Sequence, residues 1–370
     1  MVNILLNQVR EALSRIKIVD NLARQKMLIM TVCALVKSRS VLLNELAYHL
    51  NDKVKTSSNE TRLQDFFREV PFDYEALAAF LLCFLTDSAA GKSQKIRLTI
   101  DRTEWDFGQQ QTNILMVIAT KGDYTVPIYW ELLDNKSGNS HTQDRVDILK
   151  KCLQLIGAKN ISYLVADREF IGHAWLKWLK DNKIPFCVRV PKNHLIEKQD
   201  GEHLNAEQIW KTQKSPTSFR ICLVDGIWLS AKITTDAKGE LLFLIGTLEP
   251  QFLEQFYKKR WTIETLFQAF KSRGFNLEAT HLKDNQKLKK LIAIVSITFA
   301  LCVSMGIFKH QQDKAIKTKN HSRKANSFFR YGLDFLREGS KQNYKYAQKW
   351  AELFIKFIKS IFTTNSISVT

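Results

Sequence analysis

One segment near the two-thirds point of the chain carries a phenol, a carboxylate and two cations at spacings that suit a single helical face. Residues 252–273 contain no glycine or proline, so the sequence predicts one helix of about six turns. At about 100° per residue, Tyr257, Arg260 and Lys271 all lie within about 40° of Glu264 around that helix. One acid flanked by cations suits a metal ligand beside a polyanion, and a solvated charged face is the ordinary alternative.

Two aspartates upstream are candidates to join Glu264. Asp101 closes a predicted strand over residues 96–100, and Asp167 follows a predicted strand over residues 161–166. If these strands are neighbours in one sheet, both carboxylates meet at one edge, and the packed helix brings Glu264 to the same place. Three carboxylates this close together need a compensating cation. A turn residue is the ordinary alternative for either aspartate taken alone.

Phosphoryl transfer is the chemistry that such a triad suits. Carboxylate oxygens are hard ligands, which favour Mg²⁺ or Mn²⁺. Two such ions stabilise the attacking and the leaving oxygen of an in-line displacement. We therefore predict Asp101, Asp167 and Glu264 as catalytic and metal-binding residues, with Asp101 bridging two ions. We further predict that Arg260 and Lys271 hold flanking phosphates and that Tyr257 donates to a phosphate oxygen. Arg168 and Glu169 either support this site or lie on the surface.

The elements that position these residues are predicted as an α/β core between two helical regions. The N-terminal 92 residues show helical spacing over residues 5–17, 21–37, 41–50, 61–68 and 74–85. Strands are predicted at 96–100, 113–120, 125–133, 161–166 and 186–190, with helices at 144–156 and 173–182. Followed by the Glu264 helix, this is the order of a ribonuclease-H-like domain. We predict units of 1–92, 93–194, 195–250, 251–308 and 309–370, of which 195–250 is a β-rich insertion.

Two segments allow more than one interpretation. Residues 41–50 and the following helix, with Arg62 and Arg68, fit either a DNA-reading helix-turn-helix or an ordinary helical bundle. Residues 291–308 are uncharged and long enough for a transmembrane helix. Ser296 and Gly306 weaken that interpretation and favour a buried core helix.

Charge and cysteine usage indicate the class of partner and the compartment. The chain has 55 Lys and Arg against 37 Asp and Glu, a net charge of +18, and +14 of this falls in residues 251–370. Such an excess favours nucleic acid, with an anionic membrane as the weaker option. The six cysteines form no C-x-x-C pair, and charged residues interrupt the N-terminal segment. We therefore expect a cytoplasmic protein without disulfides, zinc site or signal peptide.

The charged residues of the predicted helix and their surroundings resemble a known family. The pattern Y-x2-R-x3-E-x6-K and the strings LTIDRTEW, VADREF, RWTIETLF and FFRYGLDFLR are similar to those of bacterial insertion-sequence transposases of the DDE class, over about residues 96–337. The resemblance implies a metal-binding triad of Asp101, Asp167 and Glu264 with two Mg²⁺ or Mn²⁺ ions. It also implies cut-and-paste transposition through a DNA hairpin, with terminal inverted repeats and target DNA as substrates and a homodimer in the synaptic complex.

The resemblance leaves several questions open. In related enzymes an aromatic residue of the insertion holds a flipped base, and Trp228 is the candidate here, although the string IWLSAK equally suits a place in the sheet core. The rival interpretations of the whole chain are a non-catalytic DNA-binding remnant, a structure-selective nuclease without strand transfer, and a membrane-associated protein. An intact triad and signature argue against the remnant.

Overall fold

The N-terminal region of the computed structural model is helical, as the sequence predicts. The structure describes residues 17–85, 95–107, 110–133, 138–320, 323–339 and 344–363, so the helix predicted over residues 5–17 lies, apart from Lys17, outside them. The next four helices are α2 (Leu22–Ser38), α3 (Leu43–Leu50), α4 (Thr56–Glu69) and α5 (Tyr74–Leu82). The side chain of buried Asn59 donates to the carbonyl oxygens of Ala47 at 3.1 Å and Asn51 at 2.9 Å, which fixes α4 against α3.

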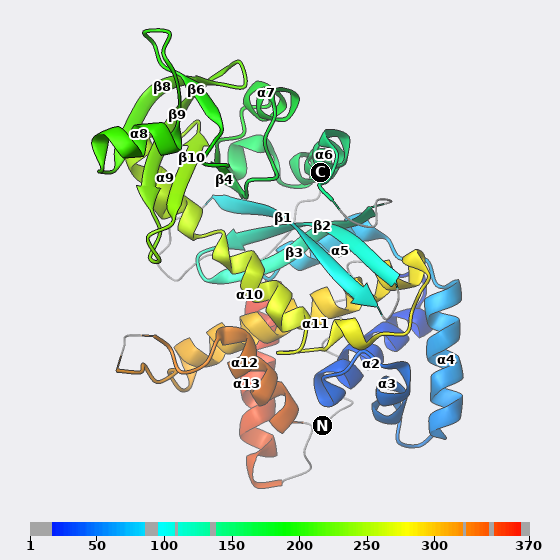
Figure 1. Cartoon of the computed structure of the whole chain (residues 1–370). Helices are drawn as coiled ribbons and strands as arrows, with labels where there is room; N and C mark the ends of the chain where they lie inside the picture. Colours follow the sequence, from blue (N-terminus) through cyan, green and yellow to red (C-terminus); the bar gives the residue numbers. More distant parts are fainter. Residues whose placement is uncertain are drawn as a thin grey trace.

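A mixed sheet forms the centre of the molecule, and its first five strands have the predicted order (Figure 1). An antiparallel meander of β1 (Ile96–Phe107), β2 (Gln110–Lys121) and β3 (Tyr124–Leu133) is followed by β4 (Ile161–Ala166) and β5 (Phe186–Val190). β4 pairs in parallel with β1 and with β5, which gives the order β3-β2-β1-β4-β5. The connecting helices are α6 (Thr142–Ile156) and α7 (His173–Asp181). This is the predicted ribonuclease-H-like core.

The β-rich insertion extends the core sheet. It contains β6 (Leu195–Glu197), β7 (His203–Asn205), α8 (Ala206–Gln213), β8 (Thr217–Val224), β9 (Ile227–Thr235) and β10 (Leu241–Gly246). β10 pairs antiparallel with β5, so the ten strands form one hydrogen-bonded sheet. Gly246 permits this approach, because a Cβ there would lie 2.2 Å from the carbonyl oxygen of Phe186. The insertion is therefore attached directly to the core strand that follows Asp167.

The sequence predicts one continuous helix over residues 252–273. This prediction is wrong, because the helix is interrupted and ends earlier. The structure has α9 (Pro250–Lys258) and α10 (Trp261–Phe270). Between them the amides of Lys259 and Arg260 bond to carbonyls three residues back, at 3.0 and 2.8 Å, which is 3₁₀ geometry. The physical reason is that the two halves pack on different surfaces: α9 on β5, β9 and β10, and α10 on β1 and on α11 (Asn285–Gln312).

The apolar segment of residues 291–308 belongs to a core helix. It lies in α11 (Asn285–Gln312), and 89% of its most apolar stretch is buried inside the protein. Among the described residues, α11 is the only continuous helix long and apolar enough to cross a membrane. It packs against α2, β3 and the last two helices, α12 (Phe328–Glu338) and α13 (Tyr344–Thr363). The interpretation as a buried core helix is the one that the structure supports.

Candidate active site

Asp101 lies within β1 and not at its end, which corrects the sequence prediction. The strand continues to Phe107, and Asp101 pairs with Met116 of β2. The parallel pairing with β4 stops at Thr99 and Val165, however, and β4 ends at Ala166. Asp101 and Asp167 therefore each lie two residues beyond the last position at which β1 pairs with β4. The backbone therefore brings the two aspartates together at one edge of the core, as expected.

Each aspartate is held through one oxygen by the backbone amide that follows it. The amide of Arg102 donates to Asp101 Oδ1 at 2.9 Å, and the amide of Arg168 donates to Asp167 Oδ1 at 2.8 Å. Asp167 Oδ1 also accepts from the Tyr257 hydroxyl at 3.0 Å. Both carboxylates are therefore oriented with Oδ1 toward donors of the protein and Oδ2 toward the space between the strands and the α9–α10 junction.

Arg260 occupies that space and joins all three acids. Its Nη1 lies 3.2 Å from Asp101 Oδ2 and 3.9 Å from Asp167 Oδ2, and its Nη2 donates to Glu264 Oε1. The Arg260 side chain is only 12% exposed. The sequence predicted that these residues meet, but it assigned Arg260 to a flanking phosphate. In this structure the guanidinium lies between the three carboxylates and offsets part of their charge.

Tyr257 is a packed residue as well as a polar one. It is 8% exposed and packs in an apolar cluster with Val165, Cys187 and Leu253. Only its hydroxyl reaches the site, where it donates to Asp167. Burial is the main cause that raises the pKa of the Tyr257 phenol, so the hydroxyl remains a hydrogen-bond donor at neutral pH.

The Lys271 ammonium does not reach the three acids, although helical spacing predicts that Lys271 shares the face of Glu264. α10 ends at Phe270, and Lys271 leaves the helix with ψ of −148°. Its Nζ lies 2.9 Å from Glu278 Oε1 and 5.9 Å from the centre of the Trp105 ring. The structure therefore brings together five of the six predicted site residues, Asp101, Asp167, Tyr257, Arg260 and Glu264, and places Lys271 beside them in a separate ion pair.

Burial and mutual charge set the protonation behaviour of the site. Burial raises the pKa of Asp101 to about 7, while Arg260 opposes this shift by favouring the charged carboxylate. Burial alone would lower the pKa of Arg260, but the phenol of Tyr257 and the three carboxylates outweigh it and raise that pKa. Arg260 is therefore permanently charged, and its guanidinium is a cation that the protein itself supplies to the site.

The residues after Asp167 have two different roles. Glu169 supports the site, because its Oε2 accepts from Arg102 Nε at 2.9 Å. Arg168 is exposed and lines a pocket of about 650 Å³ together with Arg189, Lys192, Trp210 and Lys211. Arg189 on β5 is close enough for its charge to act on the pKa of Tyr257. Sequence reasoning missed Arg189, since a single arginine inside an apolar strand gives no signal of its partners.

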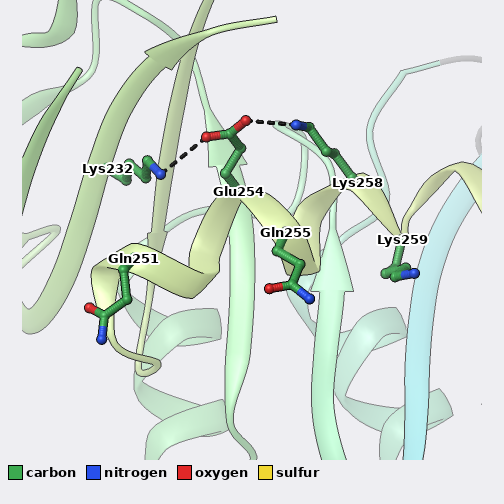
Figure 2. Close-up of a pocket in the computed structure, with 6 residues that line it drawn as sticks. All are labelled: Lys232, Gln251, Glu254, Gln255, Lys258 and Lys259. Atoms are coloured by element: carbon green, nitrogen blue, oxygen red, sulfur yellow. Dashed lines mark hydrogen bonds and ion pairs between the residues drawn. The ribbon is translucent and has the colours of Figure 1, made fainter. Parts of the chain in front are cut away.

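Figure 2 shows a second pocket, on the outer side of α9, which serves as a contrast to the candidate active site. Glu254 lies there between Lys232 at 3.1 Å and Lys258 at 2.7 Å. The Lys258 side chain is 68% exposed. Helical geometry predicts that Lys258 points away from Glu264, and the structure agrees: its acid partner is Glu254.

Two tryptophans are exposed on the elements around the site. Trp228 on β9 is 50% exposed, which excludes the interpretation that its side chain lies in the sheet core. Trp261, the first residue of α10 and the neighbour of Arg260, is 62% exposed. Large exposed aromatic side chains are suited to stack on nucleic-acid bases.

The three carboxylates fit a hard divalent cation in chemistry. They supply oxygen ligands only, which are the ligands that Mg²⁺ and Mn²⁺ prefer, and all three lie around one guanidinium. In the described part of the chain, no three His, Cys, Asp or Glu side chains are grouped closely enough to share an ion as they stand. Around these three carboxylates, the guanidinium of Arg260 lies where a shared cation would lie.

The strand order and the acids at the edge of β1 and β4 define a ribonuclease-H-like catalytic core. Residues 89–301 match the family model described as the transposase DDE domain, which is more than half of the chain, and the chain belongs to this family. Among solved structures, it is similar to piggyBac transposase in the cryo-EM structure of its synaptic complex with hairpin DNA. That match has 12% identity and a TM-score of 0.44, and covers 95% of this chain and 74% of the other. No curated protein sequence matches this chain.

Proposed function

We propose that this DDE transposase is encoded by a bacterial insertion sequence and moves it by cut-and-paste transposition. Water, and then a freed 3′-hydroxyl, would attack phosphodiester bonds at the transposon ends and in target DNA. The observation that carries the proposal is the convergence of Asp101, Asp167 and Glu264, from three separate segments of the family's domain, on the single guanidinium of Arg260. The Y-x2-R-x3-E-x6-K pattern supports the assignment to insertion sequences.

Asp101, Asp167 and Glu264 would hold two Mg²⁺ or Mn²⁺ ions, which stabilise charge on the attacking and the leaving oxygen when bound. The protein's own residues prepare this chemistry. The amides of Arg102 and Arg168 fix the orientation of the two aspartates. The Tyr257 hydroxyl holds Asp167 from the side of the insertion. Arg260 supplies a charged fork that binds a phosphate as readily as a carboxylate.

Double-stranded DNA is the proposed substrate. The excess positive charge of the last third of the chain supports this, because Lys and Arg contacts to phosphates supply most of the affinity for DNA. The pocket beside Asp167, with Arg168 and Arg189 in its wall, supports a DNA strand passing close to the acids. Trp228 remains our candidate for the base contact in a hairpin-forming mechanism, and Lys271 our candidate for a phosphate contact at the edge of the site.

The remaining assignments concern the organisation of the whole protein. The helices of residues 1–92 would recognise the transposon ends, and residues 309–370 would form a basic C-terminal region. Two copies of the chain would act as a homodimer in the synaptic complex, in the bacterial cytoplasm. A structure-selective nuclease with the same core is the alternative, and it differs in one product: it would cleave the ends but never join them to target DNA.

The test uses the DNA that flanks the gene. Short inverted repeats bracketed by a direct duplication would identify the ends. A duplex carrying these ends, incubated with the full chain and Mg²⁺, should be cleaved and joined to a target plasmid. Asp101→Asn and Glu264→Gln should abolish cleavage and leave DNA binding in gel-shift assays largely intact. Glu254→Gln, on the outer side of α9, is the matched control and should cleave normally. Cleavage that persists in Asp101→Asn, or in EDTA, would refute the proposed mechanism.

A further inference from the structure

Arg260 and the metal proposed above compete for the same atoms. Oδ1 of Asp101 accepts a hydrogen bond from the amide of Arg102. Oδ1 of Asp167 accepts from the amide of Arg168 and from the Tyr257 hydroxyl. Among the described residues, the Oδ2 atoms of both aspartates have Arg260 Nη1 as their polar partner, and Nη2 bonds to Oε1 of the third acid, Glu264. Because a guanidinium and a divalent ion cannot both occupy that position, one excludes the other.

The contacts of Arg260 show what holds it in place. Within the described residues, its polar contacts are with the three carboxylates, and its Nε is buried without a hydrogen-bond partner. The remaining contact is with the Tyr257 ring, 5.5 Å from the guanidinium carbon. The position of the guanidinium therefore depends on the acids. A phosphate offers the same paired oxygens as a carboxylate and so provides an alternative partner.

The charges of the site favour an exchange of partners. One guanidinium compensates only one of the three carboxylates. If Arg260 moved to a DNA phosphate, the three carboxylates would be free to bind divalent cations, and the phosphate would gain the cation that the acids release. Arg260 lies at the 3₁₀ turn between α9 and α10, where the helix is already interrupted. Such interruptions often mark positions at which a helix adjusts.

Resting on the function proposed above, we propose that Arg260 is a lock on the metal site. In the DNA-free protein it occupies the metal-binding oxygens of Asp101 and Asp167, and a DNA phosphate withdraws it. Metal binding and DNA binding are therefore positively coupled, so that each raises the affinity for the other by the same factor. The lock keeps the nuclease poorly loaded with metal until a DNA strand lies in the site.

The first test measures Mn²⁺ binding by the DNA-free full chain, from the EPR signal of unbound Mn²⁺ at constant pH. Arg260→Gln should bind Mn²⁺ about tenfold more tightly than the unsubstituted protein, within the usual range of coupling between sites. Lys258→Gln also removes one positive charge, but Lys258 pairs with Glu254 and not with the three candidate metal ligands. Its affinity for Mn²⁺ should stay within about twofold of that of the unsubstituted protein, as for other exposed charges. Equal or weaker binding by Arg260→Gln would overturn the proposal.

Two further variants locate the effect and protect against misfolding. The gain in Mn²⁺ affinity should disappear in the double variant Arg260→Gln with Asp101→Asn, because the ion then loses one of the carboxylate oxygens that Arg260 releases. Arg260→Lys keeps the charge but not the fork, and should bind Mn²⁺ with intermediate affinity. If Arg260→Gln shows no cooperative thermal transition, it is not folded, and the test then rests on Arg260→Lys. In that case, an affinity of Arg260→Lys for Mn²⁺ equal to that of the unsubstituted protein would count against the lock.

The second test adds a random-sequence duplex of about 40 base pairs at low salt, where phosphate contacts dominate binding. The unsubstituted protein should bind Mn²⁺ more tightly with the duplex than without it, and Arg260→Gln should show no such gain. An unchanged affinity of the unsubstituted protein would overturn the release by DNA. Failure of the lock is distinguishable from failure of the proposed function, because a lock that fails leaves Mg²⁺-dependent end cleavage intact, whereas absence of cleavage refutes the function itself.

Discussion

Arg102 and Glu169 form an ion pair that joins the two strands carrying the candidate catalytic aspartates. Arg102 Nε lies 2.9 Å from Glu169 Oε2, and each side chain is only 15% exposed. Arg102 directly follows Asp101, and Glu169 comes two residues after Asp167. Arg102 also donates to Asn113 Oδ1 on β2 at 3.1 Å. The pair therefore links the segments that follow the two aspartates and supports the spacing between them.

Removal of one partner of this pair should affect both stability and catalysis. Glu169→Ala leaves the partly buried Nε of Arg102 without its acceptor, while Nη1 keeps Glu104 at 2.6 Å, so the free energy of unfolding should fall by about 1–3 kcal/mol. End cleavage should fall as well, because Asp101 and Asp167 lose their common support. Urea denaturation measures the first effect, and the rate of cleavage of a transposon end measures the second.

An exposed ion pair provides the control for Glu169→Ala. Asp65 lies 2.5 Å from Arg68, with side chains that are 44% and 58% exposed. Asp65→Ala should therefore change the free energy of unfolding by about 0–1 kcal/mol and leave cleavage unchanged. If both variants lose the same stability and cleave equally well, the Arg102–Glu169 pair does not support the site.

The pKa of Asp101 predicts a pH dependence of stability with a definite sign. Burial raises this pKa from its ordinary value of 3.8 to about 7, so between these values the folded protein binds more protons than the unfolded chain. Stability contributed by Asp101 is therefore lost as pH rises from 4 toward 7 and is constant above that. Asp101→Asn cannot ionise. Its melting temperature relative to the unsubstituted protein should increase between pH 5 and pH 8, in metal-free buffer, and a constant difference would contradict the assignment.

The elements were predictable from the sequence where local pattern determines them. β4 occupies residues 161–166 as predicted, because an apolar run bounded by polar residues can only be a buried strand in this order of elements. Asp101 was placed at a strand end because the apolar alternation stops at Ile100. The strand continues to Phe107 because its polar second half pairs with β2, which is a long-range interaction.

The interactions within the site were less predictable than its members. Helical spacing brought Tyr257, Arg260 and Glu264 together correctly, since these three are close in sequence. It did not predict that the ammonium of Lys271, at the end of α10, pairs with Glu278 seven residues later. The contact of Arg102 with Glu169 spans 67 positions, and no spacing rule connects residues that far apart.

The Tyr257 hydroxyl should matter more for catalysis than for folding. Tyr257→Phe keeps the ring in its apolar cluster and removes only the hydrogen bond to Asp167 Oδ1. Asp167 retains the amide of Arg168, so the free energy of unfolding should change by about 1 kcal/mol or less. Cleavage should fall because Asp167 is free to rotate. Tyr163→Phe, at another partly buried tyrosine of the same cluster, is the control, and an equal loss of cleavage there would show that the effect is not specific to Asp167.

The basic C-terminal region makes the last prediction, which concerns the salt dependence of DNA binding. Deletion of the residues after Phe308 is not a clean test, because Phe329, Leu333 and Phe357 of that region are buried in the core. Substitution of exposed lysines is cleaner. Lys314, Lys317 and Lys319 lie between α11 and α12, are exposed, and make no ion pair with any described carboxylate.

Replacement of these three lysines by glutamine should weaken DNA binding at low salt and flatten its dependence on salt. The slope of log K against log salt should fall by about 0.9 for each lysine that contacts a phosphate. The matched control replaces Lys177, Lys198 and Lys258, each of which pairs with an acid four residues away. Fluorescence anisotropy with a labelled duplex between about 50 and 200 mM salt measures both slopes. Equal slopes for the two triple variants would show that the segment between α11 and α12 does not contact DNA.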